Sequence, residues 1–259
     1  MTDAITRITK SIEIYDTIDT TMEHPPPIQP GATIALEQTR GRGRTGPWIS
    51  SRGGLWLTIH IPDTQPPPGL SVALGGCLAH TLNQGLPGHS LRVKWPNDIV
   101  AHGKKLAGIL IEHRDDTLRI GIGINVYNKP PTGAVNLASL GYHGSLADAL
   151  LATIHATLQA LTVTETCIAQ AASLDALRGC TVEAVTPHGA LQGTGAGIAP
   201  DGALILDTGT TVERITCCHV RRYTCPHQEA AQGSRHGITK PPGPPHPTSA
   251  KQSPKRGPR

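Results

Sequence analysis

Three arginines alternate with glycines in the stretch EQTRGRGRTGPWIS, residues 37–50: Arg40, Arg42 and Arg44. A guanidinium group matches the paired oxygens of a carboxylate or a phosphate. The glycines let the backbone approach an anion closely and let the segment change shape. Gln38, just before them, could hydrogen-bond an uncharged polar group of the same ligand. The stretch predicts an anion-binding loop, although a solvated Arg/Gly loop or an RNA-binding patch would show the same pattern.

A second polar cluster follows in the stretch VKWPND, residues 93–98. Lys94, Asn97 and Asp98 place an ammonium group, an amide and a carboxylate around a turn that the proline fixes. The carboxylate could bind Mg²⁺, and Trp95 could pack on a flat ligand. The alternative, which the segment alone favours, is an ordinary turn with a buried tryptophan.

Two single residues complete the candidates. Lys105 opens the apolar segment KLAGILIEH, so its ammonium would lie at the end of a strand. The alternative is a lysine whose stem covers apolar surface. Asn125 ends the segment GIGIN, where its amide could face a phosphate or a metal-bound water, or cap a turn. GIGIN is not a dinucleotide-binding fingerprint, because it lacks the GxGxxG spacing and a following helix.

Hydrophobic spacing predicts the elements that would hold these side chains. Alternating apolar residues indicate strands over residues 11–19, 32–39 and 53–62, and a run of short apolar segments covers 91–126. Four-residue spacing predicts helices over residues 70–86 and 144–161. Ser145 and Asp148 would cap the second helix. The RDD triplet at 114–116 is typical of a hairpin turn, and the prolines at 25–27 limit any helix before them to about a turn.

The pattern changes near residue 177. Short strands separated by glycine-containing turns predict a small all-β domain or barrel, joined to the first part through residues 166–177. The stretch APDGALIL, residues 199–206, is similar to a type I′ hairpin. Residues 224–259 contain eight prolines and few apolar side chains, which predicts a disordered tail.

Charge and length exclude several classes. The tail carries six Lys/Arg against one acid and residues 1–223 carry 17 against 18, so the net charge of +4 belongs to the tail. The sequence has no apolar run near the roughly 18 residues of a membrane span. The N-terminal segment lacks the apolar core of a signal peptide, so we expect a cytoplasmic protein.

The six cysteines are irregularly spaced, which argues against a disulfide framework and favours small buried side chains. Five possible zinc ligands lie close together near the end of the folded part: Cys217, Cys218, His219, Cys225 and His227. No CxxC pair is present, and neighbouring cysteines point to opposite faces of a strand. We therefore expect no metal site there.

The order of these motifs, GRGR, KWPND, KKLAGILIE and GIGINV followed by a small β domain, resembles the biotin–protein ligase family from about Ile12 to Arg222. The resemblance implies an α+β fold: a mixed β-sheet flanked by helices, similar to class II synthetases, followed by an SH3-like β-barrel. The implied boundaries are a catalytic domain at 1–172, the barrel at 173–223 and the tail at 224–259. The implied form lacks an N-terminal DNA-binding domain, so we expect no specific DNA binding and no membrane.

The resemblance also implies a two-step reaction. Biotin attacks the α-phosphate of ATP to give biotinyl-5′-AMP and diphosphate, and a lysine of a biotin carboxyl carrier protein then attacks this adenylate. Mg²⁺ would accompany ATP, with Asp98 and Asn125 as candidate ligands. Lys105 and Arg42 are the implied catalytic residues.

Binding roles follow from the same resemblance, position by position. The residues implied to contact biotin are Thr20, Thr21, Gln38, Arg42, Gly43, Arg44 and Lys105. Those implied to contact ATP or the adenylate are Arg42, Arg44, Trp48, Lys94, Asn97, Asp98, Lys105 and Asn125.

The sequence departs from the family pattern at two places. The arginine loop ends early as Gly46-Pro47-Trp48, and Met22 stands where the family has an asparagine. Two alternatives remain: a lipoate or octanoyl transferase of the same fold, and a nucleic-acid-binding protein that uses the Arg/Gly loop and the basic tail. A homodimer is common in the family and is left open here.

Overall fold

The computed structural model describes residues 11–187, 189–217 and 219–226. Residues 1–225 form one compact unit and 226–259 a second, so each is considered by itself. The predictions for the N-terminal segment, for Cys218 and for the tail from His227 onward fall outside the described residues. The domain boundaries implied by the resemblance remain predictions.

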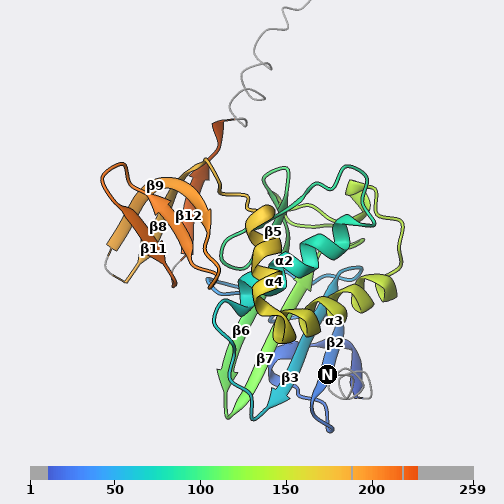
Figure 1. The fold of residues 1–259 in the computed structure, drawn as a ribbon. Helices are drawn as coiled ribbons and strands as arrows, with labels where there is room; N and C mark the ends of the chain where they lie inside the picture. Colours follow the sequence, from blue (N-terminus) through green and yellow to red (C-terminus); the bar gives the residue numbers. More distant parts are fainter. Residues whose placement is uncertain (1–10, 188, 218, 227–259) are drawn as a thin grey trace, which may run out of the picture. The chain divides into compact units, whose positions relative to one another are not determined.

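A seven-stranded mixed sheet forms the first part of the chain (Figure 1). Its strand order is β1-β2-β3-β7-β6-β5-β4, with β1 and β2 parallel and all other neighbours antiparallel. The strands are β1 (Ile12–Ile18), β2 (Gly31–Gln38), β3 (Leu55–Pro62), β4 (Leu91–Lys94), β5 (Asp98–Ala101), β6 (Lys104–Arg114) and β7 (Thr117–Ile124). The sheet matches the predicted strands and the mixed α+β architecture.

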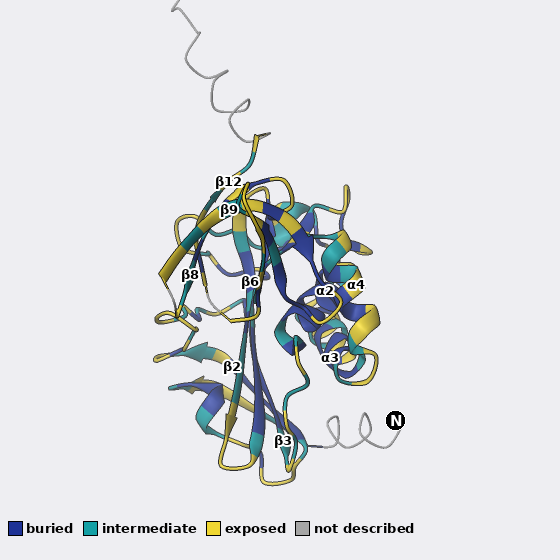
Figure 2. Ribbon diagram, turned by 60° about the vertical axis from the view of Figure 1, so that its left-hand side comes forward, coloured by how far each residue is buried: buried dark blue, intermediate teal, exposed yellow. Residues whose placement is uncertain are grey.

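Helices cover one face of this sheet, and the core lies between them and the strands (Figure 2). These helices are α2 (Leu70–Asn83), α3 (Leu146–Thr162) and α4 (Thr164–Ser173). The chain also has two short 3₁₀ helices, η1 (Thr21–Glu23), which packs against Thr58 of β3, and η2 (Ala138–Leu140). The predicted capping box of α3 is confirmed: Asp148 N donates to Ser145 Oγ, and Ser145 N donates to Asp148 Oδ2. The prolines after η1 end it after one turn, as expected.

Two turns test the hairpin predictions. Between β6 and β7, Asp115 and Asp116 both adopt left-handed backbone angles, φ of +52° and +53°, as a type I′ turn requires. The predicted turn within residues 199–206 is different, because Gly202 is left-handed there while Asp201 is not. The β9–β10 connection is therefore a longer loop and not a two-residue type I′ turn.

The predicted all-β region is a five-stranded antiparallel sheet with the order β11-β10-β9-β8-β12. Its strands are β8 (Thr181–Thr186), β9 (Gly189–Ile198), β10 (Leu204–Asp207), β11 (Val212–Ile215) and β12 (His219–Thr224). Hydrogen bonds join it to the first sheet. The indole N–H of Trp95 donates to the carbonyl of Gly202 in the β9–β10 loop at 2.9 Å, and Val93 exchanges backbone hydrogen bonds with Leu174 and Ala176 in the connection that precedes β8.

Two disulfides correct the prediction about the cysteines. Cys77 of α2 is bonded to Cys167 of α4, and Cys180 to Cys225. The helix α4 occupies part of the segment that we predicted to be a connection, and it packs so closely on α2 that a Cβ at Gly76 would lie 2.2 Å from the Cys167 carbonyl oxygen. Spacing along the chain does not reveal such an approach, because 90 residues separate the two cysteines.

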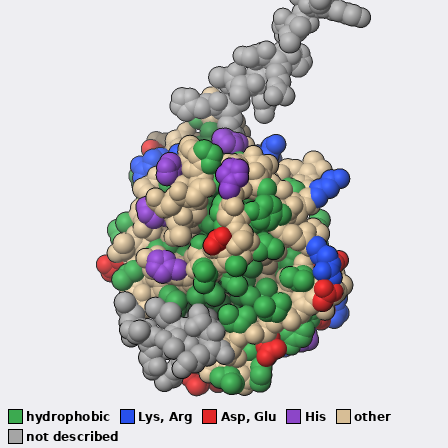
Figure 3. Space-filling model, turned by 90° about the vertical axis from the view of Figure 1, so that its right-hand side faces the viewer, with side chains coloured by type: hydrophobic (Ala, Val, Ile, Leu, Met, Phe, Trp, Pro, Cys, Tyr) green, Lys and Arg blue, Asp and Glu red, His purple; other side chains and the backbone are tan. Residues whose placement is uncertain are grey.

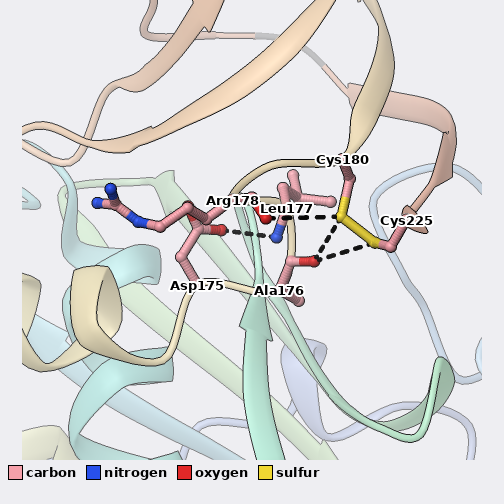
Figure 4. The surroundings of a disulfide bond; sticks show 6 residues. All are labelled: Asp175, Ala176, Leu177, Arg178, Cys180 and Cys225. Carbon is pink, nitrogen blue, oxygen red and sulfur yellow. Dashed lines mark hydrogen bonds between the residues drawn. A yellow bond between two sulfur atoms is a disulfide. The ribbon is translucent and has the colours of Figure 1, made fainter. Parts of the chain in front are cut away.

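The second disulfide joins Cys180, just before β8, to Cys225, just after β12 (Figure 4). The sulfurs of Cys180 and Cys225 lie 3.4 and 3.8 Å from the carbonyl oxygen of Ala176. Beside them, Leu177 N donates to the Asp175 carboxylate at 2.8 Å. Because Cys225 is disulfide-bonded, it is not a thiolate ligand for zinc. Among the described residues, no group of three or more His, Cys, Asp or Glu could hold a metal ion.

The surface of the described part includes apolar as well as charged regions. Figure 3 shows apolar side chains gathered on one face, with most charged groups toward its edges. The more exposed apolar residues include Ile14, Ile28 and Val212. Within the described ranges, no single helix is long and apolar enough to cross a membrane, and only the bent pair α3–α4 satisfies that test by length and composition.

The buried disulfide between α2 and α4 predicts a measurable stabilisation. Replacing Cys77 and Cys167 together by serine should lower the free energy of unfolding by about 4 kcal/mol, because the bond closes a 90-residue loop in the unfolded chain. Urea unfolding of the variant and the wild type, both without reductant, measures this loss. Replacing the exposed Cys217 by serine is the matched control and should change little. Equal stability of the double variant and the wild type would mean that the bond is absent in solution.

Candidate functional site

Two adjoining pockets lie beside the arginine loop on the seven-stranded sheet. The first, here called the threonine pocket, is lined by Thr20, Thr21, Met22, Gln38, Arg42, Gly43, Arg44, Trp48, Leu57, Thr58, Asn97, Lys105, Gly108, Ile109, Leu110, Gly121, Ile122 and Gly123. The second, the lysine pocket, is lined by Gly43, Arg44, Thr45, Gly46, Pro47, Trp48, Lys94, Trp95, Pro96, Asn97, Asp98, Lys105, His219 and Val220. Lys105, Arg44 and Trp48 belong to both pockets, so they lie where the two meet.

The arginine loop folds back on itself as a short hairpin over these pockets. Gly43 N donates to the carbonyl of Gly46 at 2.8 Å, and Trp48 N donates to that of Gly41 at 2.9 Å. A Cβ at Gly41 would lie 2.5 Å from the Trp48 carbonyl oxygen, so only glycine fits at this crossing. The shortened GPW ending therefore brings Trp48 back to the start of the loop.

The three arginines of the loop have different partners. Arg40 pairs with Asp19 at 2.7 Å and does not line either pocket. Hydrogen bonds from Thr20 N, His24 and Arg40 lower the pKa of Asp19 to about 2. Arg40 thus anchors the loop to the end of β1, while Arg42 and Arg44 reach the pockets.

Arg42 lies between two carboxylates. Its Nη1 is 3.0 Å from Glu23 Oε1 and its Nη2 is 2.7 Å from Glu112 Oε2. Arg44 donates from Nη1 to Asn97 Oδ1 at 3.2 Å, which links the loop to the KWPND segment. The loop is therefore held over the pockets by side chains of η1, β6 and the β4–β5 turn.

Asp98 holds two lysines in the lysine pocket. Its Oδ1 lies 2.6 Å from Lys105 Nζ and its Oδ2 lies 3.6 Å from Lys94 Nζ. Lys105 Nζ also lies 4.9 Å from the centre of the Trp48 ring, and Lys94 Nζ lies 5.7 Å from that of Tyr223 in β12. Burial and the nearby Asp98 carboxylate raise the pKa of Tyr223. Both ammonium groups are thus oriented by a carboxylate and an aromatic ring.

Uncharged polar groups form the opposite end of the threonine pocket. Gln38 Oε1 accepts from Thr21 N at 2.8 Å and from Thr21 Oγ1 at 3.1 Å, while its Nε2 donates to Ser50 Oγ at 2.7 Å. The hydroxyls of Thr21 and Thr58 are 2.7 Å apart. This network leaves Gln38 little freedom to turn, so its amide and the threonine hydroxyls present a fixed pattern of donors and acceptors.

Glycines on β6 and β7 make room for the ring of Trp48. A Cβ at Gly123 would lie 2.6 Å from Trp48 Nε1, and one at Gly108 would lie 2.9 Å from Trp48 Cζ3. The Nε1 of Trp48 is buried and has no hydrogen-bond partner among the described residues. A ligand acceptor in the pocket could satisfy this donor, whose burial without a partner costs about 1–3 kcal/mol.

The structure brings together nearly all the residues that the sequence singled out. Every predicted biotin-binding residue lines the threonine pocket, and the adenylate set lines one pocket or both except for Asn125. Asn125 is buried behind the site, where its Oδ1 accepts from Asn128 Nδ2 at 2.8 Å. Trp95 is buried, as in the alternative interpretation of VKWPND as a turn with a buried tryptophan, although it also contributes to the lining of the lysine pocket.

Several residues at the site escaped the sequence analysis. They are the glycines of the pocket floor, the carboxylates beside Arg42, and His219 and Val220 of β12. The alternation of glycine with isoleucine at 121–124 was the available signal for the floor. Nothing local marks Glu23 or Glu112, and the sequence analysis considered His219 only as a possible zinc ligand, because their proximity to the loop arises only from the folding of distant segments.

The candidate magnesium ligands do not form a joint metal site. Both Asp98 oxygens already face lysines, and the Asn125 oxygen accepts a hydrogen bond away from the pockets. Two ammonium groups next to one carboxylate attract an anion and repel a divalent cation. The chemistry of the donors therefore fits phosphate oxygens in the lysine pocket better than a resident metal ion.

The glycine floor gives a prediction for Trp48. Gly123→Ala should push the Trp48 ring off β7 into solvent and shift the tryptophan emission to longer wavelength, because the other two tryptophans are buried. Gly75→Ala is the matched control, since its Cβ would meet Val93 at 3.5 Å, an ordinary contact. An unchanged emission maximum for Gly123→Ala would contradict the packing of Trp48 on β7.

His60 gives a prediction for the pH dependence of stability. Burial lowers its pKa from 6.5 to about 4, while its hydrogen bond to the Thr21 carbonyl acts in the opposite direction. Between these values the unfolded chain binds a proton that the folded protein does not, so stability falls as the pH is lowered through this range. The shift corresponds to roughly 3 kcal/mol at about 1.36 kcal/mol per pKa unit.

Replacing His60 by glutamine should remove most of this loss. Urea unfolding at pH 7 and pH 4.5 measures it, with His80→Gln, an exposed position, as the control that keeps the wild-type slope. If His60→Gln lost as much stability on acidification as the wild type, the burial of a neutral His60 beneath Thr21 would be disproved.

The chain is similar to known proteins in both sequence and fold. Residues 6–126 match the model of the biotin/lipoate A/B protein ligase family. The chain is 41% identical over 105 residues to the bifunctional ligase/repressor BirA of Escherichia coli, covering 37% of this chain and 32% of that protein. It is 34% identical over 119 residues to the biotin–[acetyl-CoA-carboxylase] ligase of Mycobacterium tuberculosis, covering 42% of this chain and 45% of that one. These matches span less than half of the relatives' lengths.

Solved structures extend the similarity to most of the fold. The biotin protein ligase from Aquifex aeolicus in complex with biotin and ATP superimposes with a TM-score of 0.72 at 25% identity, covering 82% of this chain and 99% of that one. The match agrees with the large mixed sheet flanked by helices. Residues 6–126, a little under half of the chain, are thus similar in sequence to the biotin/lipoate A/B protein ligase family, and the shared fold extends the similarity to most of the chain.

Proposed function

We propose that this protein is an ATP-dependent biotin–protein ligase. The observation that carries the proposal is the position of Lys105 at the meeting point of two unlike pockets. One pocket ends in a fixed pattern of uncharged donors and acceptors, which suits the ring system of biotin. The other gathers ammonium groups, which suit the phosphates of ATP. The biotin carboxylate and the α-phosphate would then meet beside the Lys105 ammonium.

The first chemical step joins two anions, so the cations must offset their repulsion. The biotin carboxylate oxygen attacks the α-phosphorus, and the bond to the β-phosphate breaks with diphosphate as the leaving group. Lys105 is placed to bind both the carboxylate and an α-phosphate oxygen, and it stabilises the charge that develops between them. Arg42 and Arg44 extend from the loop toward the same anions, and closure of the loop would exclude water from the adenylate.

In the second step a lysine amine attacks the acyl carbon of the adenylate, the bond to AMP breaks, and the amine loses a proton to water. The proposed acceptor is a lysine of a biotin carboxyl carrier protein, the substrate class implied by the relatives that are named for acetyl-CoA carboxylase. Mg²⁺ is proposed to arrive with the ATP phosphates, since Asp98 and Asn125 do not form a site for it.

Three further features belong to the same proposal. The five-stranded sheet is proposed to be the SH3-like barrel that the resemblance implies. Absence of specific DNA binding remains a prediction, which binding assays would test, and the oligomeric state remains open to light scattering. The cytoplasmic location also remains a prediction. The thiol state of Cys77 in cell extracts tests it, because disulfides are rare in that compartment.

A labelling assay tests the function. Purified protein, biotin, ATP and a carrier domain should give a carrier biotinylated at one lysine, and Lys105→Ala should reduce the rate by about a thousandfold. The neighbouring exposed residue Lys104 is the matched control, because Lys104→Ala removes the same charge outside both pockets. The proposal fails if the wild type transfers no biotin, or if it transfers lipoate in preference to biotin.

A further inference from the structure

Two carboxylates at the arginine loop have no part in the proposed chemistry. Glu23 of η1 and Glu112 of β6 lie 3.0 and 2.7 Å from the two terminal nitrogens of Arg42. They approach the guanidinium from separate elements of the sheet region, so together they define its position and its plane. Each carboxylate takes a different terminal nitrogen, so the two contacts together restrain the rotation of the guanidinium.

A buried arginine fixes Glu23 in turn. The Arg119 side chain is only 10% exposed, and its Nη1 lies 2.9 Å from Glu23 Oε2 and 3.0 Å from the Met22 carbonyl oxygen. Burial acts to raise the pKa of Glu23, but the hydrogen bond from Arg119 and the charges of Arg42, Arg119 and Arg114 outweigh it, so this pKa is lowered. Glu23 therefore stays ionised at neutral pH.

The pairing of β6 with β7 places Glu112 and Arg119 next to each other. Glu112 on β6 stands directly opposite Arg119 on β7, so the carboxylate on the far side of Arg42 belongs to the same pair of strands. The charges alternate along the series Arg119, Glu23, Arg42 and Glu112. Three of these four side chains are on the sheet or on the short helix beside it, and Arg42 alone comes from the glycine-rich loop.

The loop needs such support because glycine leaves its backbone many conformations. Ordering each residue of the loop costs conformational entropy, and ordering a long arginine side chain costs more. The hydrogen bond to Glu112 and the ion pair with Glu23 offset part of these costs before any ligand arrives. The guanidinium has five N–H donors, so two contacts leave others for an anion in the threonine pocket, which Arg42 lines.

We propose that Glu23 and Glu112 are positioning residues that hold the Arg42 guanidinium, and with it the arginine loop, in the binding arrangement before the ligand enters. The identity of that ligand as biotin rests on the proposed function. The positioning itself is a property of the ligand-free protein and can be measured without the reaction.

The first test is hydrogen exchange in the ligand-free protein. The amides of Gly43 and Trp48 are hydrogen-bonded within the loop and exchange only when the loop opens. Glu112→Gln and Glu23→Gln should each speed their exchange about tenfold while the amides of the β3–β7 ladder keep the wild-type rate. Because Gln is nearly isosteric, each variant keeps the side-chain shape and loses only the charge.

The second test is steady-state kinetics of biotin transfer. Each variant should raise KM for biotin about tenfold with kcat within about twofold of wild type, a separation that general misfolding would not produce. The double variant should raise KM by less than the product of the single effects, because both carboxylates act on one guanidinium. Glu112→Asp should retain part of the wild-type affinity.

Glu183→Gln is the matched control. Glu183 also contacts two arginines, Arg221 and Arg222, each at 2.8 Å, but it lies in the five-stranded sheet and lines neither pocket. It should leave both readouts unchanged. Unchanged loop exchange in Glu112→Gln and Glu23→Gln would overturn the inference even if the wild type biotinylates its carrier. An inactive wild type with faster loop exchange in both variants would refute the proposed function and support the positioning.

Discussion

The site depends on the balance of charge around its cations. Four cations each border at least one of the two adjoining pockets: Arg42, Arg44, Lys94 and Lys105. Without compensation these cations would repel one another. Carboxylates offset this repulsion: Glu23 and Glu112 lie beside Arg42, and Asp98 lies between the two lysines. The side-chain oxygen of Asn97 accepts a hydrogen bond from Arg44. The fold can therefore assemble a strongly basic pocket before an anion is bound.

The mixed sheet supplies this compensation from fixed positions. Glu112 and Lys105 lie on β6, Asp98 begins β5, and η1 places Glu23 against β7 through Arg119. Only the arginine loop lies outside regular structure. When partners on regular elements hold a glycine-rich cationic loop in place, binding can be specific for a ligand without a large cost of reorganisation.

The sequence predicted local features well and non-local ones poorly. The strands, the capped helix at Ser145 and the β6–β7 turn follow from periodicity and turn chemistry, and the pocket residues follow from the resemblance of ordered motifs. The disulfide between Cys77 and Cys167 and the pairing of Arg42 with Glu112 could not be predicted, because each joins segments about 70 or more residues apart. The α4 helix was missed because its residues are small and its apolar stripe is short.

The hydrogen bonds on either side of Lys94 have a consequence for cooperativity. Val93 is bonded to Leu174 and Ala176 in the connection between α4 and β8, and Trp95 to Gly202 in the β9–β10 loop, so contacts to two separate segments flank Lys94. Displacing the five-stranded sheet together with the connection that precedes it would break these bonds and release the segment that holds the lysine pocket. We therefore expect the two sheets to unfold together at this junction, so that a destabilising change in either one is transmitted to the same lysine.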